Sequence, residues 1–328
     1  MSLLGRDLAI DLGAVSTRIY AKGKGIVLDE PSAVMRDSLT GKIIGYGADT
    51  ADDAGGETFW PVSGGLPVDG ELARRMIRHF LRKVHRRPLF RPRVVMALPE
   101  NATQLERAAL RDVAFDAEVR GILLVPHALA AALGAGLPVK DCAGRMVIDI
   151  GHDSARVAVL SHGAVVASTT VLSGGRAINR SIVRMVERQH GVLLDEREAE
   201  AAKRRAGTDW KPLHRQVVVC GRDPDTGRER SVTLAVQEIY EATKQPVEAI
   251  VRAAVDTVGR CPPELVGDLG ERGAVLVGGG ALLRGLGRRL RAALSMPVRR
   301  AERPLESVAL GLGRCAENLG LIAKLRDR

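Results

Sequence analysis

The sequence predicts an α/β protein made of two duplicated domains, and three observations lead to this prediction. The chain has 328 residues, which is long for one hydrophobic core and suits two domains. Two hairpin-like segments, LAIDLGAVSTRIYAKGKGIVL and MVIDIGHDSARVAVLSHGAVV, align with an offset of 149 − 11 = 138 residues. The aligned pairs are Asp11 and Asp149, Gly13 and Gly151, Ser16 and Ser154, and Arg18 and Arg156. A strand and helices follow each segment, as expected for repeated α/β units.

The expected elements follow in order along each copy. Each aligned segment predicts a buried strand, a tight turn, a second strand, a glycine turn and a third strand. In the first copy, a helix capped by Asp69, a strand over 93–99, a helix from about Thr103 and the helical segment ALAAALGAG follow. In the second copy, a helix over about 177–190 and a strand from Ala274 follow.

The domain boundaries follow from this alternation and from two polar, turn-rich segments. The predicted first domain covers 1–138 with an inserted subdomain at 31–65, and the second covers 139–304 with an inserted subdomain at 191–235. We expect the segment 305–328 to return to the first domain.

Charge and cysteine content narrow the classes of partner. Lys and Arg number 49 and Asp and Glu 39, so the net charge of +10 favours an anionic partner such as a lipid surface, a nucleic acid or a nucleotide. Aromatic residues make up only 3%, which leaves few to stack on bases, and we expect no nucleic-acid binding. The four cysteines form no C-x-x-C pair, which favours a reducing cytoplasm without disulfides or zinc. The sequence contains no run of 18 apolar residues, so we expect no membrane-spanning helix.

The repeated hairpins carry the predicted chemistry. A tight turn with outward-facing backbone N–H groups can hold a phosphate, and two such turns with one Asp each can hold a polyphosphate and hydrated Mg²⁺. The segment GGGALLRGL, 278–286, places glycines after a buried strand, where the backbone can approach a flat ligand such as adenine or ribose. The sequence therefore predicts a nucleotide site.

These motifs resemble the actin, chaperone and sugar-kinase ATPase superfamily, and within it the MreB/Mbl family of bacterial actins. The resemblance covers nearly the whole chain through DLAIDLG, YAKGKGIVLDEPS, RPRVVMALP, AAALGAGLPV, MVIDIG, SGG at 173–175, AVLVGGGALLRGL and PLESVALGLG. It implies an actin-like ATPase fold, in which each duplicated domain carries an inserted subdomain and the nucleotide cleft lies between the domains. The chain is identified as a divergent Mbl-like member of this family.

The resemblance also implies the cofactors and the residues that hold them. ATP or ADP would bind with Mg²⁺, held through water by Asp11 and Asp149. The implied nucleotide-binding residues are Asp11, Gly13, Ala14, Val15 and Ser16, then Asp149, Gly151, His152, Asp153 and Ser154, then Gly174, Gly175, Glu200 and Lys203, and finally Gly278, Gly279, Gly280 and Ala281.

Four segments of this site depart from the family pattern. The first loop, usually DLGTANT, is DLGAVST, and the second, usually DIGGGTT, is DIGHDSA. The family's GGDEMD is GGRAIN, with Arg176 and Asn179 in place of acids. In place of Glu-Glu-Pro the chain has Pro-His-Ala at 126–128, so His127 occupies the position of the glutamate that positions the attacking water. A carboxylate at Asp153, about 4 Å from a polyphosphate, would cost roughly 1–4 kcal/mol of binding.

These departures predict a nucleotide pocket with weak or no ATP hydrolysis, so the chain is at most a weak ATPase. The alternative is that they are neutral exchanges in a fully active MreB-type ATPase. A sugar kinase would need a catalytic Asp in the first half and sugar-binding segments, and the sequence has neither.

The resemblance implies a cytoplasmic protein that lies on the inner face of the cell membrane and forms filaments with itself. These filaments would organise cell-wall synthesis and cell shape, with wall-synthesis proteins or an MreB paralogue as partners. In HRRPLFRPR, Leu89 and Phe90 occupy the position of the family's apolar membrane loop, and apolar residues between arginines suit a headgroup region. The alternative for this segment is a solvated basic turn. The alternative to a filament is a non-polymerising adaptor for wall-synthesis proteins.

Overall fold

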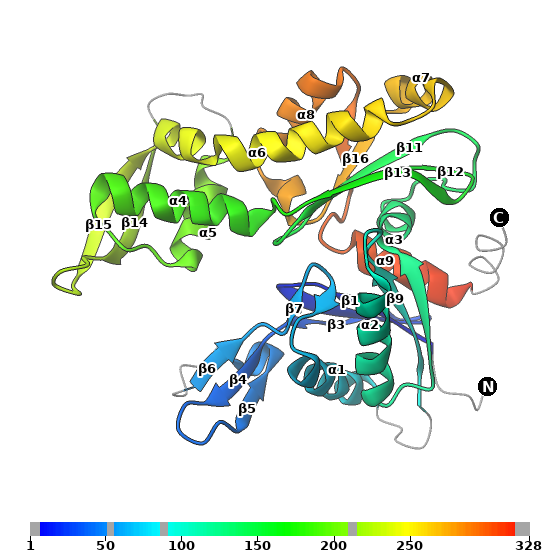
Figure 1. Ribbon diagram of the computed structural model, residues 1–328, viewed down its shortest axis with the longest axis horizontal. Helices are drawn as coiled ribbons and strands as arrows, with labels where there is room; N and C mark the ends of the chain where they lie inside the picture. Colours follow the sequence, from blue (N-terminus) through cyan, green and yellow to red (C-terminus); the bar gives the residue numbers. More distant parts are fainter. Residues whose placement is uncertain (1–6, 51–55, 86–90, 209–214, 319–328) are drawn as a thin grey trace. The chain divides into compact units, whose positions relative to one another are not determined.

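The structure, a computed structural model, describes residues 7–50, 56–85, 91–208 and 215–318. The chain divides into two compact units, which Figure 1 shows in the colours of the sequence. Unit 1 consists of Met1–Cys142, Leu160–Val165 and Leu305–Arg328, and unit 2 consists of Ala143–Val159 and Val166–Pro304. The last helix therefore packs with unit 1, although it follows unit 2 in the sequence.

A five-stranded sheet of order β10-β9-β1-β2-β3 forms the centre of unit 1. The strands are β1 (Leu8–Leu12), β2 (Ser16–Ala21), β3 (Gly25–Pro31), β9 (Arg93–Leu98) and β10 (Gly121–Pro126). Strands β1, β2 and β3 pair antiparallel through tight turns, whereas β9 lies parallel to β1 and β10 parallel to β9. The predicted three-strand meander is confirmed.

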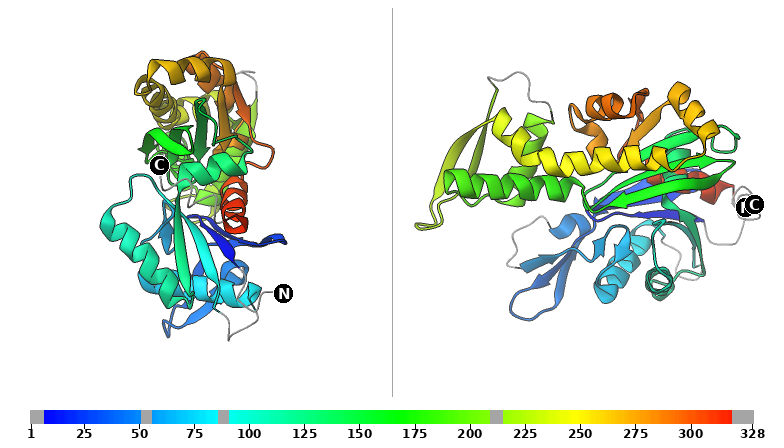
Figure 2. Two further views of the ribbon diagram at one scale, coloured as in Figure 1. Left: turned by 90° about the vertical axis from the view of Figure 1, so that its right-hand side faces the viewer. Right: turned by 45° about the horizontal axis from the view of Figure 1, so that its top comes forward.

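Helices cover both faces of this sheet (Figures 1 and 2). They are α1 (Gly70–Val84), α2 (Gln104–Asp116), α3 (His127–Gly134) and α9 (Ser307–Glu317). Apolar residues of α1 and α2 join Leu8, Ile10 and Leu12 in one core, because alternate residues of a strand face one side of the sheet. Helices α3 and α9 pack together on the other face.

The start of α1 agrees with the prediction from the sequence. The Asp69 side chain accepts a hydrogen bond from the Leu72 N–H at 2.9 Å, which satisfies one of the donors at the helix start. Thr103 and Glu106 form a capping box before α2.

The segment between β3 and α1 forms a separate small sheet of order β5-β4-β6. Its elements are β4 (Val34–Asp37), β5 (Ile43–Tyr46), the 3₁₀ turn η1 (Gly47–Thr50) and β6 (Gly56–Phe59), followed by the short strands β7 (Val62–Ser63) and β8 (Leu66–Pro67). Tyr46 stacks on His79 of α1 with ring centroids 4.6 Å apart, so this sheet rests on α1.

Unit 2 repeats the sheet topology of unit 1, with the order β13-β12-β11-β16-β17. The strands are β11 (Arg145–Ile150), β12 (Ala155–Ser161), β13 (Ala164–Val171), β16 (Ala274–Val277) and β17 (Val298–Arg300). As in unit 1, the two strands that come after the meander are parallel, β16 to β11 and β17 to β16. The predicted duplication is therefore confirmed in the strand order as well as in the hairpins.

The other elements of unit 2 are mainly helical. They are α4 (Gly175–His190), α5 (Glu196–Ala206), the hairpin of β14 (Gln216–Arg222) and β15 (Glu229–Ala235), α6 (Val236–Gly259), α7 (Pro263–Arg272), the 3₁₀ turn η2 (Gly279–Leu282) and α8 (Leu286–Leu294). None of the helices in the described ranges is long and apolar enough to cross a bilayer. All four cysteines lie in these ranges as free thiols.

Two boundaries differ from the sequence expectation. Helix α4 begins at Gly175, two residues before the predicted start, because its first N–H groups bond to the preceding hairpin. The glycines at 278–280 lead into a single 3₁₀ turn, and α8 begins only at Leu286. Gly285, with φ of +87°, separates the two, because a left-handed residue cannot continue a right-handed helix.

Candidate functional site

The first predicted phosphate loop is the turn between β1 and β2 of unit 1. The Gly13 N–H donates to the Ser16 carbonyl at 3.1 Å, and a Cβ at Gly13 would lie 2.6 Å from that oxygen. Ser32 holds the turn from outside, since its hydroxyl donates to the Gly13 carbonyl at 2.6 Å and its N–H to the Val15 carbonyl at 2.9 Å. The turn is thus fixed from both sides, with Val15 exposed at its tip.

The second predicted loop, between β11 and β12 of unit 2, has the same internal hydrogen bond. The Gly151 N–H donates to the Ser154 carbonyl at 2.9 Å. The start of α4 closes on this turn, because the Gly175 N–H donates to the Gly151 carbonyl at 3.0 Å and the Arg176 N–H to the His152 carbonyl at 2.8 Å. A Cβ at Gly174 would lie 2.4 Å from the His152 carbonyl, so glycine is required there. The structure thus brings Gly174 and Gly175 together with the second loop.

Two side chains that depart from the family pattern meet at this turn. The Asp153 side chain is only 7% exposed, and its Oδ1 lies 3.4 Å from Nε of Arg176. The same Arg176 Nε donates to His152 Nε2 at 3.4 Å, and that ring nitrogen lies 3.5 Å from a carboxylate oxygen of Glu196. The Asp153 carboxylate, which is expected to repel phosphate, therefore has a guanidinium beside it.

The charge state of His152 follows from its surroundings. Burial lowers the pKa of His152 below its ordinary value, although the Asp153 and Glu196 carboxylates oppose this shift. A neutral ring is consistent with Nε2 accepting the hydrogen bond from Arg176. The His152 ring is therefore mainly in its neutral form at pH 7.

The predicted adenosine-side residues form a compact polar cluster in unit 2. Lys203, which is 7% exposed, donates to Glu200, which also accepts from Arg204 Nε at 2.8 Å and Asn179 Nδ2 at 3.0 Å. Burial would raise the pKa of Glu200, but the hydrogen bond and charge of Lys203, with Asn179 and Arg204, lower it to about 2. Burial also lowers the pKa of Lys203, despite the opposing effect of Glu200.

This cluster leaves one acceptor open. Asn179 is 1% exposed, and its Oδ1 accepts no hydrogen bond within the part of the chain that the structure describes. A buried acceptor of this kind fits a ligand that brings a donor.

The glycine loop after β16 packs against the strand that carries Asp149. A Cβ at Gly278 would lie 2.3 Å from Asp149 Oδ1, and one at Gly280 would lie 2.2 Å from Ile150 Cγ2. Asp149 itself is 6% exposed. Glycine is needed here for contact with β11, a reason that the sequence pattern did not reveal.

His127 is the first residue of α3, and it is buried in unit 1 at 8% exposure. The next residue, Ala128, takes the place of the family's proline and so has an N–H. That N–H donates to the Glu100 carboxylate at 2.6 Å, which places an anion at the start of the helix. Sequence reasoning missed Glu100; the additional N–H that Ala128 provides was the available signal.

Leu89 and Phe90, the predicted membrane residues, lie outside the described residues. The described residues stop at His85, at the end of α1, and resume at Arg91, before β9. In β9, Arg93 forms an ion pair with Asp7 at 2.9 Å.

No three metal-binding side chains in the described ranges are grouped so that they could hold an ion by themselves. A metal at the predicted site would therefore need oxygen ligands from water or a nucleotide, which is usual for Mg²⁺.

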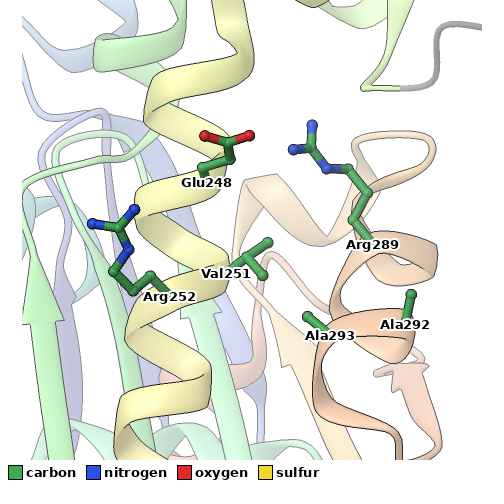
Figure 3. A pocket seen from close by; sticks show the side chains of 6 residues that line it. All are labelled: Glu248, Val251, Arg252, Arg289, Ala292 and Ala293. Atoms are coloured by element: carbon green, nitrogen blue, oxygen red, sulfur yellow. The ribbon is translucent and has the colours of Figure 1, made fainter.

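A separate groove of about 550 Å³ runs between α6 and α8 of unit 2 (Figure 3). Its lining consists of Glu248, Val251, Arg252, Arg289, Ala292 and Ala293. None of the predicted nucleotide residues lines this groove.

The duplicated sheets and paired Asp-x-Gly turns define an actin-like protein, and comparison with known proteins identifies the family. The family model for MreB/Mbl protein matches residues 5–324, so the chain belongs to the MreB/Mbl family. It is 40% identical to the cell shape-determining protein MreB of Escherichia coli K12 over 97% of this chain and 95% of that protein. It is 34% identical to the cell shape-determining protein Mbl of Bacillus subtilis 168, over 98% and 99%.

Solved structures agree with this assignment. MreB5 of Spiroplasma citri bound to ADP superposes with a TM-score of 0.89 at 25% identity, covering 98% of both chains. The MamK double helical filament has a TM-score of 0.79 at 18% identity, covering 95% of this chain and 98% of that one, which shows the shared fold. The predicted actin-like fold class is confirmed.

Proposed function

We propose that this chain forms filaments along the cytoplasmic face of the cell membrane and that these filaments organise cell-wall synthesis and cell shape. The support is its membership of the MreB/Mbl family and its similarity to relatives named as cell shape-determining proteins. The MamK filament, of the same fold, is consistent with self-association. Wall-synthesis proteins or an MreB paralogue are the partners that this role requires.

The filament subunit binds ATP or ADP with Mg²⁺ in this proposal. The observation that carries it is the pair of equivalent turns, each closed by one hydrogen bond from the glycine of Asp-x-Gly, at 3.1 Å for Gly13 and 2.9 Å for Gly151. The relative from Spiroplasma citri was crystallised with ADP and with AMPPNP. Ala14 to Ser16 and His152 to Ser154 would contact phosphate, the cluster around Glu200 and Lys203 the adenosine, and the loop at 278–281 the adenine.

Asp11 and Asp149 would hold hydrated Mg²⁺. The fit rests on their chemistry, since each turn offers one carboxylate and leaves most of an octahedral shell to water and phosphate oxygens. When bound, the metal neutralises charge on the phosphates. The His152 and Asp153 side chains replace glycines and make binding weaker than in a glycine-only loop.

Hydrolysis is slow in this proposal because His127 stands where the family has a water-positioning glutamate. A buried imidazole at the first turn of α3 has a different shape and reach from a carboxylate. The Glu100 carboxylate is engaged by the Ala128 N–H at 2.6 Å, which fixes it at the helix start. The chain is therefore at most a weak ATPase.

Phosphate release at saturating Mg-ATP tests this. We expect His127→Glu to raise the rate by about a hundredfold, at the low end of what a positioned acid or base contributes. His127→Gln, which has the length of Glu without the charge, is the matched control and should not raise it. A wild-type rate equal to that of His127→Glu would instead support a fully active ATPase.

Co-sedimentation with vesicles tests the membrane role. Changing Leu89 and Phe90 to Ser should release the protein from anionic vesicles, because the apolar anchor is lost while the positive charge remains. Leu39→Ser is the control, since Leu39 is 96% exposed on another turn. Unchanged binding of the double variant would favour a solvated basic turn. Electron microscopy on the same vesicles, with and without Mg-ATP, distinguishes filaments from a monomeric adaptor.

A further inference from the structure

The contact between Asp153 and Arg176 joins two positions that are 23 residues apart and differ from the family pattern. Asp153 stands in the second phosphate turn, where the family has glycine. Arg176 is the second residue of α4, where the family has aspartate after two glycines. Their closest charged atoms, Asp153 Oδ1 and Arg176 Nε, lie 3.4 Å apart.

The geometry fixes this contact from the backbone as well as the side chains. The Arg176 N–H donates to the His152 carbonyl at 2.8 Å, so the start of α4 is bound to the residue before Asp153. The Asp153 side chain is 7% exposed and that of Arg176 is 35% exposed. The Asp153 side chain is therefore largely withdrawn from solvent, whereas about a third of the Arg176 side chain remains exposed.

Three other groups near this contact, His152, Glu196 and Lys203, do not offset the Asp153 charge as Arg176 does. His152 accepts a hydrogen bond from Arg176 and is neutral at pH 7, because burial lowers its pKa. Glu196 lies 3.5 Å from the His152 ring and adds negative charge nearby. Lys203 donates to Glu200, so its charge is already engaged. Arg176 is thus a cation that lies beside the Asp153 carboxylate and is not offset by these neighbours.

We propose that Arg176 is a positioning residue that neutralises Asp153 and thereby allows a carboxylate in the phosphate turn. The inference rests on the proposed nucleotide binding and specifies how the altered turn performs it. Relative to the family pattern, an acid has moved from the helix start into the turn, and an arginine has taken its former place. The summed formal charge of these two positions is −1 in the family pattern and zero in this chain, so the exchange does not increase the negative charge near phosphate.

The consequence is that the two substitutions depend on each other. If Arg176 is removed, the Asp153 carboxylate loses this cation, and nucleotide phosphate is repelled. If both charges are removed, the turn is neutral again. A direct phosphate ligand would behave differently, since its loss would weaken binding whether or not Asp153 is charged.

A double-mutant cycle separates these cases. The binding of Mg-ADP is measured by calorimetry at low salt for the wild type, Asp153→Asn, Arg176→Gln and the double variant. Arg176→Gln should weaken binding about tenfold, and adding Asp153→Asn should restore most of this loss. The gain from Asp153→Asn should be several-fold larger in the Arg176→Gln background than in the wild type. Adding about 0.5 M salt should reduce the effect of Arg176→Gln, because screening shortens the range of charge repulsion.

Two further variants keep the result interpretable. Arg180→Gln removes the same charge from an exposed position one turn further along α4, and its affinity should equal that of the wild type. Arg176→Lys keeps the charge and should retain most of the affinity. Equal weakening by Arg180→Gln and Arg176→Gln would overturn the inference, as would a gain from Asp153→Asn that is the same in both backgrounds. If none of the proteins, including the wild type, binds Mg-ADP, the proposed nucleotide binding fails, and this inference fails with it.

Discussion

The contact between α3 and α9 in unit 1 should tolerate no side chain at Gly311. An ideal Cβ there would lie 1.8 Å from the Ala130 carbonyl oxygen, and one at Gly134 on the facing helix would lie 1.6 Å from the Ser307 carbonyl oxygen. Carbon and oxygen atoms normally approach no closer than about 3.3 Å, so Gly311→Ala forces the helices apart by roughly 1.5 Å. Both obstacles are backbone atoms, which cannot turn aside as a flexible side chain would.

The cost follows from overpacking of a close contact. Inserting a methyl group into a filled core costs about 1–3 kcal/mol, and a backbone collision belongs at the upper end. For a unit of this size, a loss of about 3 kcal/mol lowers the melting temperature by roughly 6–12 °C. Helix α3 begins at His127, so the same change should also alter phosphate release.

The test is to compare the melting temperature of Gly311→Ala with that of a second Gly→Ala variant in which the added methyl group meets no neighbour. Gly267 lies in α7, where a methyl group added to the glycine would have nothing within 4 Å. Gly267→Ala should therefore stabilise by up to about 1 kcal/mol through helix propensity. Opposite signs for the two changes are expected. A melting temperature for Gly311→Ala equal to or above that of the wild type would refute the reasoning.

Two other predictions concern titrating groups. The pKa of Glu200 is about 2 in the folded chain against an ordinary 4.5, so its pairing stabilises the fold above pH 4.5 and is lost as the pH falls towards 2. The difference in unfolding free energy between wild type and Glu200→Gln should shrink over that window; a constant difference would contradict it. Burial raises the pKa of Cys315 to about 11, whereas Cys142 is exposed. Timed alkylation near neutral pH with mass spectrometry should label Cys142 first, and equal rates would contradict this.

The elements with local signals were predicted best from the sequence. The Asp-x-Gly repeat predicted both meanders, and Asp69 predicted the start of α1, because caps and alternation depend on neighbouring residues. The start of α4 was predicted two residues late, since the bonds that begin it come from the turn at Gly151 and His152. Such bonds join segments that a local pattern does not connect.

The glycines show the same limit. The run at 278–280 was correctly singled out, but its closeness to Asp149 and Ile150 depends on two parallel strands meeting side by side. The close approach of Gly134 and Gly311 joins helices that are far apart in the sequence. Both features require the tertiary fold, which no single segment of the sequence specifies.

The departures from the family pattern have a different meaning once their neighbours are known. Considered one at a time, Asp153 adds a repulsive charge and Ala128 merely replaces a proline. In the structure each has a counterpart from a distant segment, Arg176 at 3.4 Å for Asp153 and Glu100 at 2.6 Å for the N–H of Ala128. A charge or donor that gains a partner costs far less than one left alone, so judging each substitution by itself overestimates its cost.

The exchange at His127 is of another kind, because it changes the chemistry of the group at the proposed water position and not only a balance of charge. A carboxylate offers two acceptor oxygens, whereas a neutral imidazole offers one acceptor nitrogen and one donor. No neighbouring group can give the ring a second acceptor. The proposed slow hydrolysis therefore depends on His127 more than on Asp153, which is why His127→Glu alone, with the Asp153 and Arg176 pair left intact, should raise phosphate release.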